Sequence, residues 1–153
     1  VFRQKNAELA KLAYGANYDQ VMEAPVTIAL FTDTDLQKRA RKIARVGGVK
    51  NFTDEQLQYF MQNLPAEFAR YDAQQTSDYL ALNAGFVAMN LVLALTDQGI
   101  GTNIILGFDK SKINEVLDIE ERFRPEVLIT VGYAAEKVEP SYRLPVDEII
   151  DKR

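Results

Sequence analysis

The sequence has 153 residues, of which 47% are apolar and 26% charged, and its formal net charge is −4. This length is sufficient for one soluble domain with a hydrophobic core. The chain has no Cys and no His, which excludes disulfides, thiol nucleophiles, Ser-His-Asp triads and thiolate or imidazole metal sites. An acidic pI of about 4.9 disfavours a dedicated nucleic-acid-binding protein. Chemistry must therefore come from carboxylates, Lys, Tyr, backbone groups or a cofactor.

Predicted helices and strands alternate along the sequence without an internal repeat, which indicates an α/β or α+β fold. The glycine pair at 47 and 48 is expected to end a basic helix. Thr53 and Gln56 have the spacing of a capping box that begins the next helix. In chain order we expect helices at 6–14 and 18–24, a strand at 25–31, helices at 35–46, 53–64, 66–71 and 76–98, a strand within 101–107, a helix capped by Asp109 or Ser111 and ending at 117, a strand at 126–131, and a polar extended tail from 134.

The helix predicted at 76–98 is the most informative element, because residues 79–96 carry no charge. This stretch is just long enough to span a membrane. However, Asn83 and Asn90 lie inside it, and Asp residues rather than Lys or Arg flank both of its ends. We therefore expect a central helix that is buried within the domain or between two subunits.

Three local patterns permit a binding role but favour a structural one. Asp33 and Asp35 are spaced like paired carboxylates, yet acidic residues at a strand end commonly cap the next helix. Gly99-x-Gly101 follows a helix instead of a strand, so it does not form a dinucleotide-binding fingerprint. The helix predicted at 35–46 is basic, with Lys38, Arg39, Arg41, Lys42 and Arg45. One of its faces carries Lys38, Arg41 or Lys42, and Arg45, and this face is either solvated or a surface for the phosphate of an anionic cofactor.

Several segments together resemble the nitroreductase family of flavoproteins. Each motif is weak singly, but they occur in the family's order across residues 17–145. The matching segments are 17–21, 89–94, 99–102, 107–109, 129–133 and 142–145. The resemblance implies an α+β fold with a mostly antiparallel central sheet, flanking helices and a long buried central helix. It also implies a single domain over 1–153 that forms a homodimer and lacks the family's N-terminal segment.

The same resemblance implies the residues of an FMN site. Asn17 and Gln20 would form hydrogen bonds with the polar edge of the isoalloxazine ring, since side-chain amides carry both a donor and an acceptor. Several relatives have Lys at the position of Gln20. From the residues alone, 104–106 are better explained as core, and the resemblance makes a place beside the flavin an equal alternative. The strand and turn implied to lie against the flavin consist of Ile104, Ile105, Leu106 and Gly107.

Further implied contacts involve the phosphate and the substrate. Arg143 matches the family's C-terminal phosphate contact, whereas Ser141 stands where some relatives have a second basic residue. Phe60, Phe68 and Tyr71 are candidates for the substrate channel, and ordinary core packing explains them as well.

The function implied by the resemblance is an FMN-dependent oxidoreductase. It would pass hydride from NAD(P)H through the flavin to nitroaromatics, quinones or similar acceptors in a ping-pong cycle. This flavin-based chemistry needs no protein nucleophile and no metal. We expect a cytoplasmic homodimer with small-molecule acceptors and with neither nucleic-acid nor membrane partners. The alternative is a flavin-binding or regulatory helical dimer without turnover.

Overall fold

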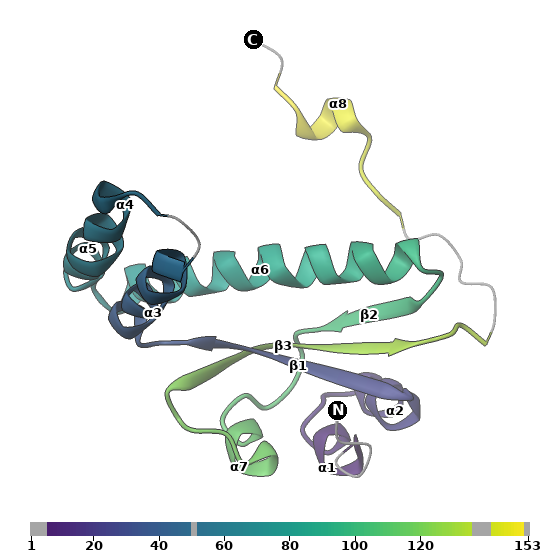
Figure 1. The fold of residues 1–153 in the computed structure, drawn as a ribbon. Helices are drawn as coiled ribbons and strands as arrows, with labels where there is room; N and C mark the ends of the chain where they lie inside the picture. Colours follow the sequence, from purple (N-terminus) through teal and green to yellow (C-terminus); the bar gives the residue numbers. More distant parts are fainter. Residues whose placement is uncertain (1–5, 50–51, 136–141, 152–153) are drawn as a thin grey trace.

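The protein was analysed as a computed structural model, which describes residues 6–49, 52–135 and 142–151. A small antiparallel sheet forms the middle layer, with the order β1 (Val26–Asp33), β3 (Phe123–Gly132), β2 (Gly101–Ile105). The long helix α6 (Ala73–Asp97) covers one face of the sheet. On the other face lie α1 (Asn6–Ala10), α2 (Asn17–Glu23) and α7 (Ile113–Leu117) (Figure 1). The described part is therefore the α+β arrangement predicted from the sequence.

The central strand β3 holds the two sides of the domain together. Leu128 packs into the cluster on the α1–α2–α7 side, whereas Val127 and Ile129 pack with Ala88 of α6. This division follows from the alternation of side chains along a strand. Leu128 and Ile129 are fully buried, so the apolar run predicted as a strand is confirmed, and the strand extends beyond it at both ends. The outer strand β1 is half-buried along its whole length.

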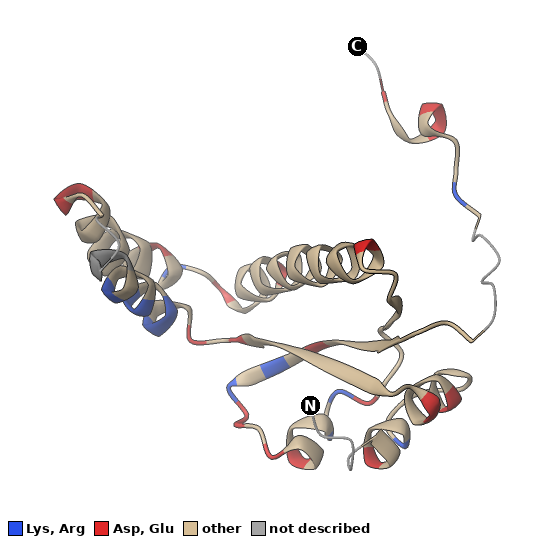
Figure 2. Cartoon of the chain, turned by 45° about the vertical axis from the view of Figure 1, so that its right-hand side comes forward, with Lys and Arg blue, Asp and Glu red and all other residues tan. Residues whose placement is uncertain are grey.

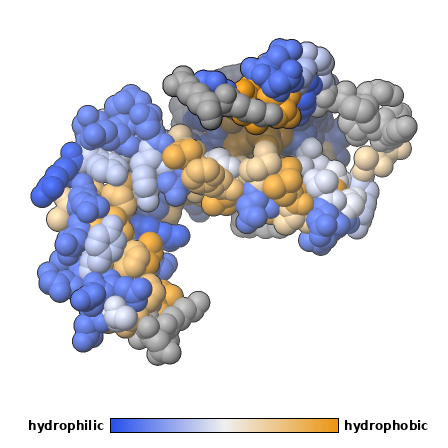
Figure 3. All heavy atoms as spheres, turned by 90° about the horizontal axis from the view of Figure 1, so that it is seen from above, coloured by the Kyte–Doolittle hydropathy of each residue, from blue (hydrophilic) through white to orange (hydrophobic). Residues whose placement is uncertain are grey.

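Helix α6 begins earlier than expected and is buried along one face only. Asp72 and Gln75 form a reciprocal capping box, so the helix begins at Ala73 and not near residue 76. Leu80, Ala84 and Ala88 are buried against the sheet. Only 17% of the apolar window of this helix is buried within the chain. The expectation of burial inside the domain is therefore wrong for the remaining faces, along which apolar side chains gather (Figure 3).

The segment between α1 and α2 is not helical, although a helix was predicted over 6–14. Residues 11–14 form a turn and a bridge, in which Ala13 pairs with Phe108 after β2. Leu9, Val21 and Ile105 lie in the same hydrophobic cluster, which fixes α1, α2 and β2 relative to one another. Tertiary pairing with the loop after β2 thus replaces the last turn of the predicted helix.

A helical arm extends beyond one end of the sheet (Figure 1). It consists of α3 (Leu36–Val49), α4 (Asp54–Gln58), the π-helical turn η2 (Tyr59–Asn63) and α5 (Leu64–Phe68). The Thr53–Gln56 capping box is confirmed. Two predicted helix ends are wrong, because the glycine pair lies inside α3 and the helix passes Pro65. Pro65 lies in the first turn of α5, directly after the π-helical turn η2.

The tail also contains regular structure that was not predicted. Helix α8 (Val146–Ile149) begins directly after Pro145 and stands away from the layers (Figure 1). Its side chains are exposed. The extended conformation predicted from residue 134 is therefore interrupted by one helical turn.

Candidate functional site

The loop after β2 is held against the start of α2. The carbonyl oxygen of Gly107 accepts hydrogen bonds from the backbone N–H of Tyr14 at 2.9 Å and from Asn17 Nδ2 at 3.2 Å. The N–H of Asp109 donates to the carbonyl oxygen of Leu12 at 2.8 Å. These bonds bring Asn17 and Gly107 together, although they are 90 residues apart in the sequence.

The contact between Asn17 and Gly107 depends on the absence of a side chain at position 107. A Cβ atom added there would lie 2.9 Å from Asn17 Nδ2, which is closer than real Cβ atoms approach. A side chain at position 107 would therefore displace the Asn17 amide from the Gly107 carbonyl, whereas the backbone conformation of Gly107 is ordinary.

Strand β2 exposes apolar side chains next to this loop. Ile105 is 1% exposed and belongs to the core, whereas Ile104 is 39% and Leu106 is 68% exposed. Ile104 and Leu106 line a cavity of about 400 Å³ beneath α6. Because β2 pairs only with β3 within the described sheet, the backbone groups on its other edge have no strand partner there. The core interpretation therefore holds for Ile105 and not for its two neighbours.

Gln20 is also drawn into this region, through a partner that sequence reasoning missed. Its Oε1 atom accepts a hydrogen bond from Asn103 Nδ2 across 83 sequence positions. Asn103 was overlooked because a polar residue in a short edge strand carries no motif. The sequence did offer one signal, because Asn103 stands two residues before Ile105 and strand spacing puts both side chains on the same face of β2. Asn17, Gln20 and Asn103 thus supply amide groups around one strand.

Arg143 does not join this group. It lies in the exposed C-terminal segment, and its Nη1 atom donates to the carbonyl oxygen of Tyr142 at 2.9 Å. No contact with Asn17 or Gly107 occurs in the described part of the chain, and Ser141 lies outside the described residues. Phosphate binding by Arg143 stays a prediction.

Of the three predicted substrate residues, Phe60 and Phe68 lie in the helical arm and Tyr71 lies in the turn between α5 and α6, at the other end of the sheet from α2 (Figure 1). Phe60 stacks on Phe52 with ring centroids 5.3 Å apart. Phe68 contacts Tyr71 at 5.6 Å and Tyr79 of α6 at 5.3 Å. Mutual packing explains these positions, and none of them reaches the amide cluster within this chain. Their role in substrate binding stays a prediction.

The acidic and basic residues around α3 have structural roles. Asp33 Oδ1 accepts a bond from the Asp35 N–H, and Asp35 Oδ1 accepts one from the Lys38 N–H, so the capping interpretation is confirmed. The described residues contain no cluster of acidic side chains suited to a metal ion. The basic side chains of α3 are exposed and lie away from α2, which disfavours the phosphate-docking alternative (Figure 2).

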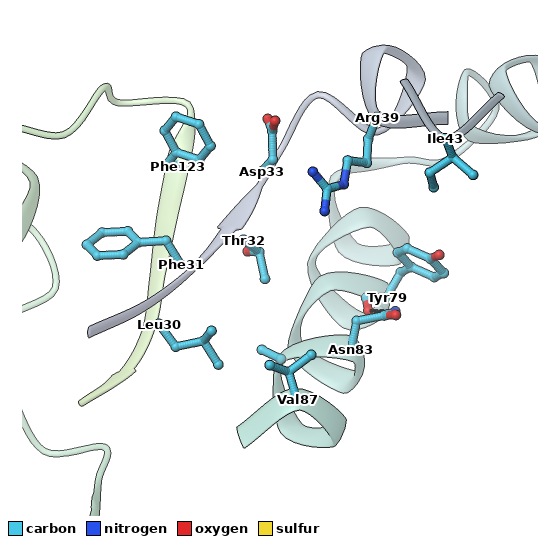
Figure 4. A pocket seen from close by; sticks show the side chains of 11 residues that line it. Leu30, Phe31, Thr32, Asp33, Arg39, Ile43, Tyr79, Asn83, Val87 and Phe123 are labelled. Atoms are coloured by element: carbon cyan, nitrogen blue, oxygen red, sulfur yellow. Dashed lines mark hydrogen bonds between the residues drawn. The ribbon is translucent and has the colours of Figure 1, made fainter. Parts of the chain in front are cut away.

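One basic residue of α3, Arg39, faces a second cavity. This cavity has a volume of about 370 Å³ and lies between β1, α3 and α6. Figure 4 shows the guanidinium of Arg39 directed toward the space between β1 and α6, near Tyr79 and Asn83. The amide of Asn83 donates to the carbonyl oxygen of Tyr79, so it is engaged in its own helix.

A polar network between α6 and the sheet was not predicted. Arg124 Nε donates to Glu126 Oε1 at 2.7 Å, and its Nη1 donates to Ser77 Oγ at 2.8 Å. Thr32 Oγ1 donates to the same Glu126 oxygen. The Glu126 side chain is only 10% exposed, so these bonds replace lost water contacts. The network fixes the first turns of α6 to β1 and β3.

Beyond Gly107, Asp109 stabilises the turn into α7. Asp109 Oδ1 accepts hydrogen bonds from Ser111 Oγ at 2.6 Å and from the Ser111 N–H at 3.0 Å. Both bonds lower the pKa of Asp109 below its usual range, and the bond from the Ser111 hydroxyl has the larger effect. Neither Asp109 nor Ser111 directly caps α7, because the N-cap position is occupied by Lys112 without a side-chain bond. The predicted side-chain cap is therefore wrong, and Asp109 and Ser111 stabilise the turn before the helix instead.

The fold and this arrangement agree with comparisons to known proteins. A model of the Nitroreductase family matches residues 1–133. The chain therefore belongs to the Nitroreductase family.

Individual relatives support the same conclusion. The chain is 61% identical to a Streptococcus pyogenes protein named Putative NAD(P)H nitroreductase. This match covers the whole of this chain and 76% of the length of the relative. A crystal structure of a nitroreductase family protein from Streptococcus pneumoniae shares 83% identity, with a TM-score of 0.95 over 99% of this chain and 76% of that one. A structure from Exiguobacterium sibiricum, solved in complex with FMN, shares 28% identity, with a TM-score of 0.86 over 97% of this chain and 71% of the other.

Proposed function

We propose that this protein is an FMN-dependent oxidoreductase of one domain that transfers electrons from NAD(P)H to nitroaromatics, quinones or similar small acceptors. The observation that carries the proposal is the junction of Asn17 with Gly107 at the open edge of β2. Membership of the Nitroreductase family and the FMN-bound relative from Exiguobacterium sibiricum support it.

The residues at this junction fit a flat heteroaromatic group with a polar edge. On the α6 side of β2, Ile104 and Leu106 offer exposed apolar surface, and the missing side chain at Gly107 leaves room for the Asn17 amide. Asn17 and Gln20 add amide groups, which can bind the donors and acceptors of a pyrimidine-type ring edge. Arg143 would contact the phosphate, for which its bidentate guanidinium is suited.

When bound, FMN supplies the redox chemistry by accepting hydride from NAD(P)H and reducing the acceptor. The protein's own side chains bind and orient the cofactor and exclude water from it. Such chemistry is compatible with a chain that has neither Cys nor His. We therefore assign binding roles, and no catalytic acid or base, to Asn17, Gln20 and Arg143.

The proposal includes a homodimer in the cytoplasm, formed through α6. Four exposed apolar residues of this helix define what we call the α6 stripe. They are Leu82, Phe86, Met89 and Leu93, whose spacing of three and four residues puts them on one face. By length and composition alone α6 is also able to cross a membrane. Its opposite face packs on the sheet through Ala84 and Ala88, which supports a protein partner for the stripe.

The proposed activity is tested with purified protein and added FMN. We expect a yellow complex that oxidises NADH or NADPH when menadione or nitrofurazone is present. A protein that binds FMN but does not oxidise either nucleotide would support the flavin-binding module without turnover. A protein that neither binds FMN nor shows activity would refute the proposal.

Replacing Gly107 with Ala should weaken FMN binding much more than folding. The new Cβ would displace the Asn17 amide, which lies at the end of a short and movable side chain. We expect about a tenfold rise in the FMN dissociation constant, the scale of one lost hydrogen bond, with little change in melting temperature. Asn17→Ala is the matched control and should reproduce the loss. An unchanged affinity in both variants would contradict the assignment.

Replacing Arg143 with Ala should weaken FMN binding by about 1–3 kcal/mol, which is typical for a lost hydrogen bond to a charged group. The dissociation constant is measured by quenching of flavin fluorescence. Arg41→Ala, on the exposed face of α3, removes the same charge away from the site and should leave the affinity unchanged. Equal losses in both variants would indicate a general charge effect in place of a phosphate contact.

A further inference from the structure

The hydrogen bond between Asn103 and Gln20 joins two elements that the core already holds rigidly. Asn103 lies on β2 two residues before Ile105, and Gln20 precedes Val21 on α2. Ile105 and Val21 are both fully buried in one hydrophobic cluster. The two polar side chains therefore meet at the rim of a packed core, although both are themselves exposed.

This bond orients the Gln20 amide. Asn103 Nδ2 donates to Gln20 Oε1, so one acceptor site of the carbonyl oxygen is occupied and the Nε2 group with its two N–H donors is left for a ligand. A glutamine amide otherwise turns easily about its last torsion angle and presents either end. With Asn103 in place, the side chain of Gln20 has two N–H donors and one carbonyl lone pair available.

We propose that Asn103 is a positioning residue that fixes Gln20 with its N–H donors toward the acceptor atoms of the cofactor. This inference rests on the proposed function, which places FMN beside Asn17, Gln20 and Gly107. A flavin ring edge carries carbonyl and nitrogen acceptors, and reduction adds negative charge to them. Fixed N–H donors stabilise such charge without having to reorient. Asn103 therefore favours both the binding and the reduction of FMN while acting through Gln20.

A double-mutant cycle separates positioning from a merely structural role. Asn103→Ala frees the amide, and we expect the FMN dissociation constant to rise by about threefold to tenfold. In a Gln20→Lys background the side chain at position 20 has only donors and nothing to orient. There, Asn103→Ala should leave the dissociation constant unchanged. Equal effects of Asn103→Ala in both backgrounds would overturn the inference.

Asn103→Asp is the matched isosteric variant. An aspartate carboxylate only accepts hydrogen bonds, so it would bind Nε2 of Gln20 and turn the carbonyl oxygen toward the cofactor. We expect this variant to bind FMN more weakly than Asn103→Ala and to lower the reduction potential of the bound flavin. Adding Gln20→Lys should restore much of the affinity. A potential and an affinity equal to those of the wild type would contradict the proposal.

The hydrogen bond itself is testable without FMN. Scalar coupling across the bond, measured by NMR on the cofactor-free protein, should connect Asn103 Nδ2 with the Gln20 side-chain carbonyl. If this coupling is absent and Asn103→Ala leaves the Gln20 signals unchanged, the inference about Asn103 is overturned, whereas the proposed function is not. A wild-type protein that shows the coupling but does not bind FMN would instead refute the proposed function.

Discussion

Replacing Phe86 with Asp should convert the proposed homodimer into a monomer. Phe86 is 65% exposed and lies in the α6 stripe, flanked by Leu82 at 59% and Leu93 at 60% exposure. A carboxylate placed in such an interface would lose its water without gaining a partner, which costs several kcal/mol. We expect the dimer dissociation constant to rise by at least about a hundredfold. Sedimentation equilibrium over a range of concentrations measures this change.

The control for this prediction is an equally exposed apolar residue outside the stripe. Val46 of α3 is 52% exposed, and Val46→Asp should leave the dimer intact. Wild-type protein that stays monomeric at micromolar concentration would contradict the role of the stripe. A wild-type monomer that binds lipid vesicles would instead support the membrane interpretation of α6. Loss of bound FMN in the Phe86 variant would further indicate that the site needs both subunits.

Removing Arg124 should have the largest effect on stability. Arg124→Met would leave Glu126, 10% exposed, with Thr32 as its remaining side-chain donor, and Ser77 would lose two bonds to the guanidinium. Breaking a buried pair by deleting one partner typically costs about 3–5 kcal/mol. Since the Arg124 side chain is 29% exposed, we expect the lower end, about 3 kcal/mol. Urea denaturation followed by circular dichroism measures the free energy of unfolding.

The double variant Arg124→Met with Glu126→Gln shows whether the cost comes from the unpaired charge. A neutral amide at position 126 can still accept from Thr32, so no charge is left buried without a partner. We expect most of the lost stability to return. Equal destabilisation in the single and double variants would indicate that the loss comes from Ser77 and the packing of α6.

Local sequence patterns predicted the elements whose causes are local. The apolar run in β3 and the Thr53–Gln56 capping box could be identified because a few adjacent residues determine them. The end of α1 could not be identified, since residue 13 pairs with Phe108, which is distant in sequence. The two alternatives for α6, burial within the domain or between two subunits, could not be separated from the sequence, because composition shows how apolar a helix is but not how many of its faces the chain itself covers.

The candidate site was predicted in part, and only through resemblance. Asn17 and Gly107 were named from separate motifs, and the structure brings them into contact. Arg143 and the arm aromatics do not meet them within the single chain. For Asn103, strand spacing indicated only that its side chain shares a face with Ile105, and not that it bonds to a residue 83 positions away. Its identification required the packing of α2 against β2.

The central claim is that this chain binds FMN and reduces it with a nicotinamide nucleotide. Anaerobic titration of the FMN-loaded protein with NADH, and separately with NADPH, tests this most directly, since no acceptor is needed. We predict that the visible absorption of oxidised flavin is lost after about one equivalent of at least one nucleotide and returns when menadione is added. Flavin that remains oxidised in excess of both nucleotides would contradict the assigned function.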